Sequence, residues 1–197
     1  MGPNQKYSFF IVSRLIFGLI LFGFGLALLV AGEFGVSPWE VFHQGISRRT
    51  PLSIGTTIIC VGIIILFILL LLKEPLGVGT VANVLIIGLV VDLTLALLGD
   101  ISNVLPRIFA TLLGPIFVGL GSGFYIGTNL GPGPRDGLMT ALNRRGLAIW
   151  KARTIIEGLC VLTGVMLGGN IGWGTIWFLF SVGPSVQFFL KRLKIDD

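Results

Sequence analysis

The sequence predicts an all-α membrane protein with about six transmembrane helices and two short helices that are either re-entrant or interfacial. Hydrophobic residues make up 54% of the 197 residues and charged residues only 12%, against about 25% charged residues in soluble domains. Several apolar runs approach the length of about 20 residues that a bilayer crossing requires. The third observation is that the second half of the chain repeats the first.

The repeat is clearest in the glycines. Shifting the sequence by 96 positions, or by 95 after the loop at Lys73, places 8 of the 11 glycines between Arg14 and Leu98 on glycines of the second half. The aligned pairs are Gly18–Gly114, Gly23–Gly119, Gly25–Gly121, Gly35–Gly131, Gly62–Gly158, Gly77–Gly172, Gly79–Gly174 and Gly88–Gly183. We therefore expect two homologous membrane repeats, residues 9–98 and 107–193, in one membrane domain with no soluble domain.

Three long apolar runs in each repeat are predicted to span the membrane. They are Phe9–Ala31, Ile54–Leu72, Leu76–Leu98, Ile108–Leu130, Thr154–Gly169 and Ile171–Leu190. Their few charges are Arg14, near the start of the first run and able to snorkel, Asp92 in the third and Glu157 in the fifth, which is also the shortest.

A short polar helix follows the first span of each repeat. Ser37, Pro38 and Glu40 match an N-cap, the first helical position and a capping box. In the second repeat Gly133 takes the cap position, followed by Pro134 and Asp136. A helix of about 11 residues is about 16 Å long, which is too short to cross a bilayer.

The path of these short helices decides the relation between the repeats. If they do not cross, each repeat has three spans and the second repeat is inverted, which we prefer; if they cross, the repeats are parallel. The distribution of Lys and Arg favours cytoplasmic N- and C-termini in both cases. Lys191, Arg192 and Lys194 are typical of a stop-transfer flank.

Ionisable and polar groups inside a membrane are candidates for function. The residues that we expect near a substrate path are Trp39, Glu40, His43, Arg135, Asp136, Asp92, Gln187 and Glu157. Asp92 and Gln187 are repeat equivalents, and Arg135 could bind a carboxylate or a phosphate with two hydrogen bonds. The alternatives are that Glu40 and Asp136 only cap helices, that His43 is a hydrogen-bonded helix residue, and that Glu157 pairs with Arg153 at the i, i+4 spacing.

A second set of candidates consists of glycines that are expected to form backbone turns or, less favoured, to line the path. They are Gly35, Gly77, Gly79, Gly131, Gly133, Gly172 and Gly174.

The sequence carries no pattern that points to an enzyme, a metal site or a cofactor. One His and two Cys far apart provide no metal-ligand set, and Cys60 and Cys160 are expected to be free thiols in spans. Gly131-Pro132-Gly133 is not followed by the Gly-Lys-Ser/Thr of a phosphate-binding loop. The net charge of +5 is attributed to membrane orientation, so no nucleic acid is expected as a partner.

The segments Gly35-Val-Ser-Pro-Trp-Glu-Val-Phe-His43 and Gly131-Pro-Gly-Pro-Arg-Asp-Gly-Leu-Met139, with the Gly-x-Gly-Thr turns, resemble the YczE-like group of bacterial membrane proteins, usually placed with the YitT family. The resemblance covers nearly the whole chain, with Glu40 where that group usually has Asp. It implies a protein of the bacterial inner membrane and brings no established substrate.

Together these features predict a transporter or channel for an unknown small solute, anionic or zwitterionic, with the path at the repeat interface near the two short helices. A carboxylate such as Glu40, Asp136 or Asp92 could couple transport to protons. The expected partners are the lipid bilayer and the unknown solute, with a membrane-protein partner or a second copy of the chain as further possibilities. The rival function is a non-catalytic accessory or regulatory subunit, or the substrate-binding subunit of a larger transport complex; a lipid-modifying enzyme is less favoured.

Overall fold

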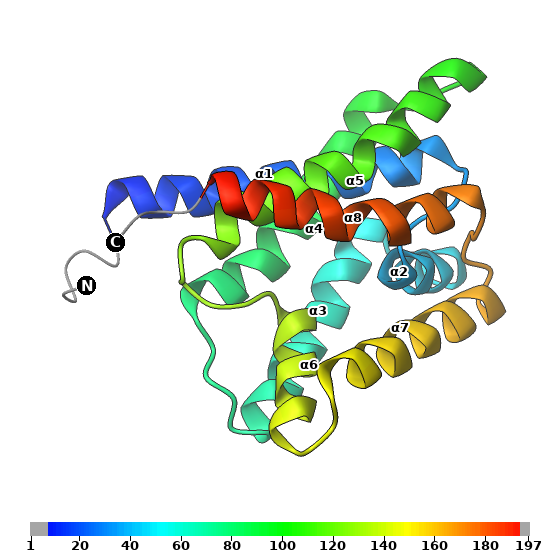
Figure 1. The fold of residues 1–197 in the computed structure, drawn as a ribbon. Helices are drawn as coiled ribbons and strands as arrows, with labels where there is room; N and C mark the ends of the chain where they lie inside the picture. Colours follow the sequence, from blue (N-terminus) through cyan, green and yellow to red (C-terminus); the bar gives the residue numbers. More distant parts are fainter. Residues whose placement is uncertain (1–7, 194–197) are drawn as a thin grey trace.

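The computed structural model describes residues 8–193, and every regular element in that range is an α-helix, which confirms the all-α membrane class (Figure 1). The eight helices of the described range are α1 (Phe9–Gly32), α2 (Pro38–Arg49), α3 (Ile54–Leu71), α4 (Val78–Leu98), α5 (Val104–Ile126), α6 (Pro134–Arg144), α7 (Ile149–Met166) and α8 (Trp173–Arg192). The two short helices α2 and α6 begin at the predicted prolines. Lys194 lies outside the described residues.

Five helices are long and apolar enough to cross a membrane, namely α1, α3, α4, α5 and α8. Helix α7 has 18 residues but is not among them, because Lys151, Arg153 and Glu157 lie in its first half. The fourth span was predicted as Ile108–Leu130, but α5 runs from Val104 to Ile126. Pro106 fits the first turn of α5, where a missing N–H leaves no intrahelical bond unmade.

The outer surface is apolar, as contact with lipid requires. On α4, for example, Leu85, Leu89, Leu93 and Leu97 follow one another at four-residue spacing and are all exposed. Residues at this spacing share one helix face, so α4 presents a continuous leucine stripe to its surroundings.

Helices α1 and α5 form the central contact and run in opposite directions (Figure 1). A Cβ added to Gly18 would lie 2.8 Å from the carbonyl oxygen of Gly121, and one added to Gly25 would lie 2.6 Å from that of Gly114. The residue number rises along α1 while it falls along α5. These glycines let the two backbones touch, which side chains would prevent.

The core divides into two clusters of buried side chains. The larger one joins α1, α4, α5 and α8 and also includes Val41 of α2 and Ile58 of α3. The smaller one joins α2, α3, α6 and α7 around Trp39, Leu69 and Ala141. Figure 1 shows the corresponding arrangement, with α1, α5 and α8 on one side and α6 and α7 on the other.

The loops before α2 and α6 are each hydrogen-bonded to the opposite half of the chain. Gly79, at the start of α4, donates its N–H to the carbonyl of Leu130, at a distance of 2.9 Å. Gly174, at the start of α8, donates to the carbonyl of Phe34, at 2.8 Å. These two bonds join positions that the predicted repeat aligns with each other.

Both loops turn at a glycine in the left-handed region. Gly35 has φ 108° and Gly131 has φ 124°, values that L side chains rarely adopt. A Cβ on Gly35 would lie 2.5 Å from the backbone nitrogen of Gly172, and one on Gly131 would lie 2.8 Å from Cα of Gly77. Conformation and space therefore both require glycine here.

The ends of α2 and α6 also reach across the molecule. Arg49 donates to the carbonyl of Leu167 at the end of α7, and Arg145 donates to that of Leu72 at the end of α3, at 3.2 and 2.9 Å. Cations at helix C-termini satisfy free carbonyls and complement the helix dipole. The two halves are thus interlocked and form one membrane unit.

Candidate functional site

The N-terminal ends of α2 and α6 meet inside the protein through a buried ion pair. Arg135 Nη2 donates to Glu40 Oε1 at 2.6 Å, and the Glu40 side chain has no exposed surface. The guanidinium also lies over the Trp39 ring, 5.1 Å from its centroid. His43 Nδ1 lies 3.4 Å from the same carboxylate oxygen.

Local sequence explains why Glu40 faces inward. Pro38 opens α2, and the hydroxyl of Ser37 accepts the N–H of Glu40 at 3.5 Å, as the cap prediction requires. The Glu40 carboxylate accepts hydrogen bonds from the Ser37 hydroxyl and from Arg135. Because a buried charge is costly unless it is paired and hydrogen-bonded, the position of Arg135 determines that of Glu40.

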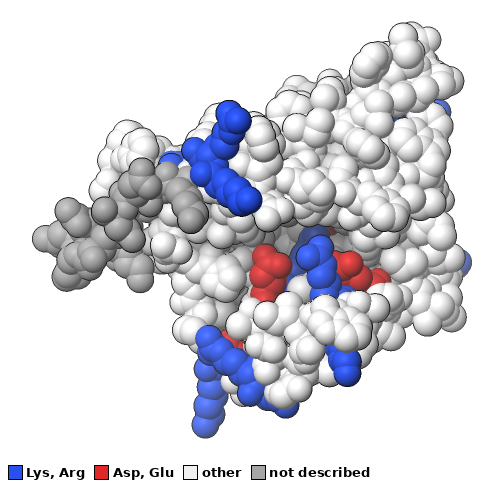
Figure 2. Space-filling model, in the orientation of Figure 1, with Lys and Arg blue, Asp and Glu red and all other residues white. Residues whose placement is uncertain are grey.

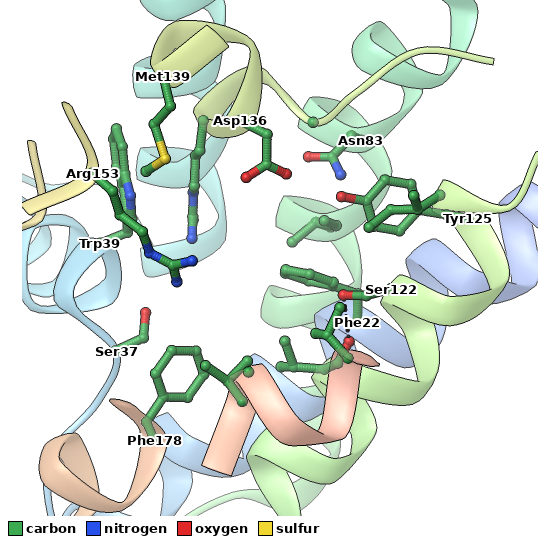
Figure 3. Close-up of a pocket in the computed structure, with 18 of the residues that line it drawn as sticks. Phe22, Ser37, Trp39, Asn83, Ser122, Tyr125, Asp136, Met139, Arg153 and Phe178 are labelled. Atoms are coloured by element: carbon green, nitrogen blue, oxygen red, sulfur yellow. Dashed lines mark hydrogen bonds between the residues drawn. The ribbon is translucent and has the colours of Figure 1, made fainter. Parts of the chain in front are cut away.

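A cavity of about 480 Å³ lies beside this pair (Figure 3). Its volume is within the usual range of about 300–1,000 Å³ for small-molecule sites. The lining comes from α1, α2, α4, α5, α6, α7 and α8, so both halves of the chain contribute. Its aromatic and aliphatic wall includes Phe22, Trp39, Ile87, Val118, Phe178 and Val182.

One end of the cavity is polar and is formed where α6 begins. Figure 3 shows Asp136, Asn83 and Tyr125 turned toward one another. A Cβ added to Gly133 would lie 3.3 Å from Tyr125 Oη, 3.4 Å from Asn83 Nδ2 and 3.6 Å from Asp136 Oδ2. A carboxylate, an amide and a phenol thus converge on the first turn of α6, where no side chain caps the free N–H groups.

The opposite wall carries a second charged pair. Arg153 Nε donates to Glu157 Oε1 at 2.9 Å along α7, which confirms the predicted i, i+4 pair. Figure 3 shows the Arg153 guanidinium pointing into the cavity, toward the space that the Asp136 carboxylate also faces. The cavity therefore presents both signs of charge to its interior.

The cavity opens to the surface between α8 on one side and α6 and α7 on the other. Figure 2 shows acidic and basic side chains gathered in a hollow on this face, surrounded by a largely uncharged surface. Gln187 and Lys191 of α8 line the hollow from one side, and Arg153 and Glu157 of α7 line it from the other.

The candidate residues from the sequence divide into three groups. Those that line the cavity are Trp39, Arg135, Asp136, Glu157 and Gln187. Glu40 and His43 lie directly behind Arg135 and are buried. Asp92 does not line it.

Asp92 instead caps α3, the neighbouring helix in the same half of the chain. Its carboxylate accepts the N–H of Gly55 at 2.8 Å and the N–H of Thr56 at 3.1 Å, at the start of α3. A carboxylate at a helix N-terminus satisfies free N–H groups and complements the dipole. Asp92 thus fastens α4 to α3.

Among the glycine candidates, Gly133 lines the cavity. The other six pack backbone against backbone in two places. Gly35 packs on Gly172 and Gly174, and Gly131 packs on Gly77. Gly79, next to Gly77, donates its N–H to the carbonyl of Leu130. Their role in the structure is close backbone contact, the favoured alternative.

Reasoning from sequence missed several lining residues. Asn83 and Tyr125 form the polar end, and Phe22, Ser122, Phe178 and Lys191 contribute elsewhere. Asn83 could have been found, because it is an amide side chain within the otherwise apolar third span. The aromatic residues carry no such signal, since lipid-facing positions hold the same residue types.

No group of three or more His, Cys, Asp or Glu side chains within residues 8–193 is arranged to hold a metal ion. Both cysteines are free thiols, with Cys60 exposed and Cys160 buried. The side chains that line the cavity offer hydrogen bonds, ion pairs and aromatic contacts to a ligand.

A bundle of apolar helices around a charged internal cavity defines this chain as a polytopic membrane protein. It belongs to the family of unknown function DUF6198, whose model matches residues 10–191. An uncharacterized protein of Haemophilus influenzae is 36% identical over 181 residues, which cover 91% of this chain and 83% of the relative. The uncharacterized membrane protein YczE of Bacillus subtilis is 31% identical over 178 residues, covering 89% and 83%.

The YyaS protein of Bacillus subtilis is more distant, at 25% identity over 185 residues that cover 90% of each chain. No solved structure matches this chain. The relatives confirm the YczE-like resemblance and the membrane location, and their names assign no substrate.

Proposed function

We propose that the protein is a small-solute transporter of the bacterial inner membrane, rather than an enzyme, and that the cavity beside α2 and α6 is its substrate site. The observation that carries the proposal is that the N-termini of the two short helices meet at a charged cavity, which is lined by both halves of the chain. Discontinuous helices whose N-termini face a central site are a recurrent transporter design.

The substrate class that fits best is a small zwitterion. The sequence suggested Arg135 as the group that binds a substrate anion. Its guanidinium is already paired with the Glu40 carboxylate at 2.6 Å, which weakens that role. Asp136 provides a carboxylate for a substrate cation, beside the acceptor oxygens of Asn83 and Tyr125. Arg153 retains N–H donors beyond the one that it gives to Glu157, so it can bind a substrate carboxylate.

We further propose that the two halves are inverted repeats with both termini in the cytoplasm. The opposite directions of α1 and α5 support this arrangement. So does the ion pair between Glu74 and Arg144, 2.8 Å long, which joins the α3–α4 loop to the end of α6. Inverted repeats put these two segments on the same side of the membrane, whereas parallel repeats put them on opposite sides.

The substrate class is tested with the purified protein, leucine and two analogues that each lack one of its charged groups. Leucine carries both charges, 3-methylbutylamine only the ammonium, and 4-methylpentanoate only the carboxylate. We expect thermal stabilisation by small zwitterions, including amino acids and betaines, and none by the single-charge analogues at equal concentration. Stabilisation by a single-charge analogue alone, or by no zwitterion of the panel, would contradict this substrate class.

Transport itself is tested by counterflow of labelled solutes in proteoliposomes. We expect Asp136→Asn and Arg153→Gln each to reduce uptake at least tenfold, as expected for the loss of an ion pair of about 1.4 kcal/mol or more. Glu33→Gln is the matched control, because Glu33 is exposed and pairs with Arg107 away from the cavity. If no solute moves and a stoichiometric membrane partner co-purifies, the accessory-subunit alternative replaces this proposal.

A further inference from the structure

The last two helices of each half, α3 and α4 in the first and α7 and α8 in the second, are packed differently. In the first half, α3 lies against α4 with glycines at the contact. A Cβ added to Gly62 would lie 2.6 Å from Val84 Cγ1, and one added to Gly88 would lie 2.5 Å from the carbonyl oxygen of Gly55. Asp92 completes the contact by binding the first turn of α3.

The aligned surfaces of α7 and α8 do not touch. Gly158 corresponds to Gly62 and Gly183 to Gly88, yet a Cβ added to either would meet no atom within 4 Å. The space between these helices is the hollow through which the cavity opens, lined by Arg153 of α7 and Gln187 of α8 (Figure 2).

Helix α7 is held by α2 instead. A Cβ on Gly164 would lie 2.6 Å from the backbone of Val41, and one on Gly45 would lie 2.6 Å from the carbonyl oxygen of Gly164. The aligned contact between α3 and α6 is also present, since a Cβ on Gly137 would lie 3.1 Å from Leu69 Cδ1. Helix α3 thus contacts both α4 and α6, whereas α7 contacts α2 but is not packed against α8.

The start of α7 also lacks what the start of α3 has. At α3, the Ser53 hydroxyl accepts the N–H of Thr56, and the Asp92 carboxylate accepts this N–H as well as that of Gly55. At α7 the cap position is Ala148, and no side chain between residues 8 and 193 accepts the first N–H groups. The repeat equivalent of Asp92 is Gln187, which is exposed in the hollow and makes no side-chain hydrogen bond to any residue in the range 8–193.

We propose that α7 closes onto α8 during the transport cycle, in the packing that α3 and α4 have here, and thereby seals the cavity from this side. Gly158 and Gly183 form the contact surfaces, and the Gln187 side-chain oxygen accepts N–H groups from the first turn of α7. Because the halves are treated as inverted repeats, α3 separates from α4 in the alternate state and opens the opposite side. This inference rests on the proposed transport function.

The movement is measured by electron–electron distances between spin labels. The labelled pairs are Leu159→Cys with Phe180→Cys on α7 and α8, and their aligned counterparts Ile63→Cys with Leu85→Cys on α3 and α4. All four positions are exposed, and the native thiols are removed by Cys60→Ser and Cys160→Ala. In lipid nanodiscs, with and without a solute that stabilises the protein, we expect two distances for each pair, and opposite changes in the two pairs.

Bulk placed at the open glycines tests the contact surfaces themselves. We expect Gly158→Leu and Gly183→Leu to fold normally, since both positions face open space, and to lose the short α7–α8 distance. Gly158→Leu should also reduce transport at least tenfold, whereas Gly183 lines the cavity itself, so the distance is the measurement for Gly183→Leu. Gly62→Leu is expected to lower the yield of folded protein, because its site is filled by Val84. The matched controls Leu162→Phe and Leu179→Phe add bulk at exposed positions on the same helices and should transport normally.

The outcomes separate closure from transport. A single long α7–α8 distance under all conditions, in wild-type protein that transports, would overturn the closure alone, as would full transport by Gly158→Leu. Two α7–α8 distances in a protein that moves no solute would overturn the proposed function.

Discussion

At the scale of single residues, Glu40 is the best-defined feature of the site. Its carboxylate is fully buried, accepts from Arg135 at 2.6 Å and lies 3.4 Å from His43 Nδ1. Taking such a charge out of water is unfavourable, so the partner that offsets it is part of the fold. Arg135 therefore holds the Glu40 carboxylate in place, and the pair lies at the cavity wall.

Removing the Glu40 charge should destabilise the protein. Breaking a buried pair from one side costs about 3–5 kcal/mol, so Glu40→Gln should lower the unfolding midpoint measured in detergent. Glu33→Gln breaks an exposed pair with Arg107 and should change stability by no more than about 1 kcal/mol. The double variant Glu40→Leu with Arg135→Met should regain stability but not transport; equal effects of Glu40→Gln and Glu33→Gln would contradict a role for the buried pair.

The two aspartates should behave in opposite ways. Asp136 lines the cavity, so Asp136→Asn should abolish zwitterion binding with little loss of stability. Asp92 accepts two N–H groups at the start of α3, and Asp92→Ala should cost about 1–2 kcal/mol, as loss of a helix cap does. Thermal unfolding with and without ligand measures both; retained ligand stabilisation in Asp136→Asn would exclude Asp136 from the site.

At the scale of elements, the two Gly-x-Gly-Thr turns hold the short helices in place. Thr80 Oγ1 accepts the N–H of Gly77 at 3.2 Å, and Thr175 Oγ1 accepts that of Gly172 at 3.4 Å. These bonds satisfy the first turns of α4 and α8. Through Gly79 and Gly174, each turn also donates a hydrogen bond to the loop that leads to the short helix of the opposite half.

Alanine at the turn glycines should therefore destabilise both halves. Gly35→Ala and Gly131→Ala force a Cβ into the left-handed region, at a cost of about 1–3 kcal/mol each, and into space that the partner turn occupies. Gly158→Ala is the control, since this helical position is open and alanine is the better helix former by about 1 kcal/mol. Unfolding midpoints compare the three, and normal stability of Gly35→Ala would exclude a structural role for this turn.

At the scale of the whole molecule, the helices build two clusters with a charged cavity between them. The halves exchange contacts, with the end of α2 on α7 and the end of α6 on α3. Neither half is complete without the other, because the cavity takes lining residues from both.

The inverted arrangement predicts which loops face each side of the membrane. In protein without native thiols, Lys73→Cys and Asn143→Cys should react with a membrane-impermeant reagent from the cytoplasmic side. Thr50→Cys and Ser102→Cys should react only from the outside. All four positions are exposed. Parallel repeats predict the reverse for Lys73→Cys, Thr50→Cys and Ser102→Cys but not for Asn143→Cys, so labelling of intact cells and of inverted vesicles distinguishes the two arrangements.

Much of the fold could be predicted because it depends on neighbours in sequence. The hydropathy of each run identifies a membrane helix, and Ser37-Pro38 marks the start of α2 within one residue. Of the aligned glycines, Gly35 and Gly131 share their backbone conformation, whereas Gly158 and Gly183 lack the close contacts of Gly62 and Gly88. The boundary of α5 was wrong by four residues, because apolar content alone does not mark where a helix ends.

The sequence by itself thus determined the class of protein, the helices and the polar residues from which a site could be built. Only the tertiary structure decided that Glu40 neutralises Arg135, that Asp92 caps α3 and that Asn83 and Tyr125 join Asp136 at the cavity. Helix propensity and hydropathy act over a few residues, whereas these contacts join positions that are far apart in the chain. Which face of a helix meets which neighbour depends on how all eight helices pack together. In that packing, α7 and α8 are separated by the hollow that leads to the cavity.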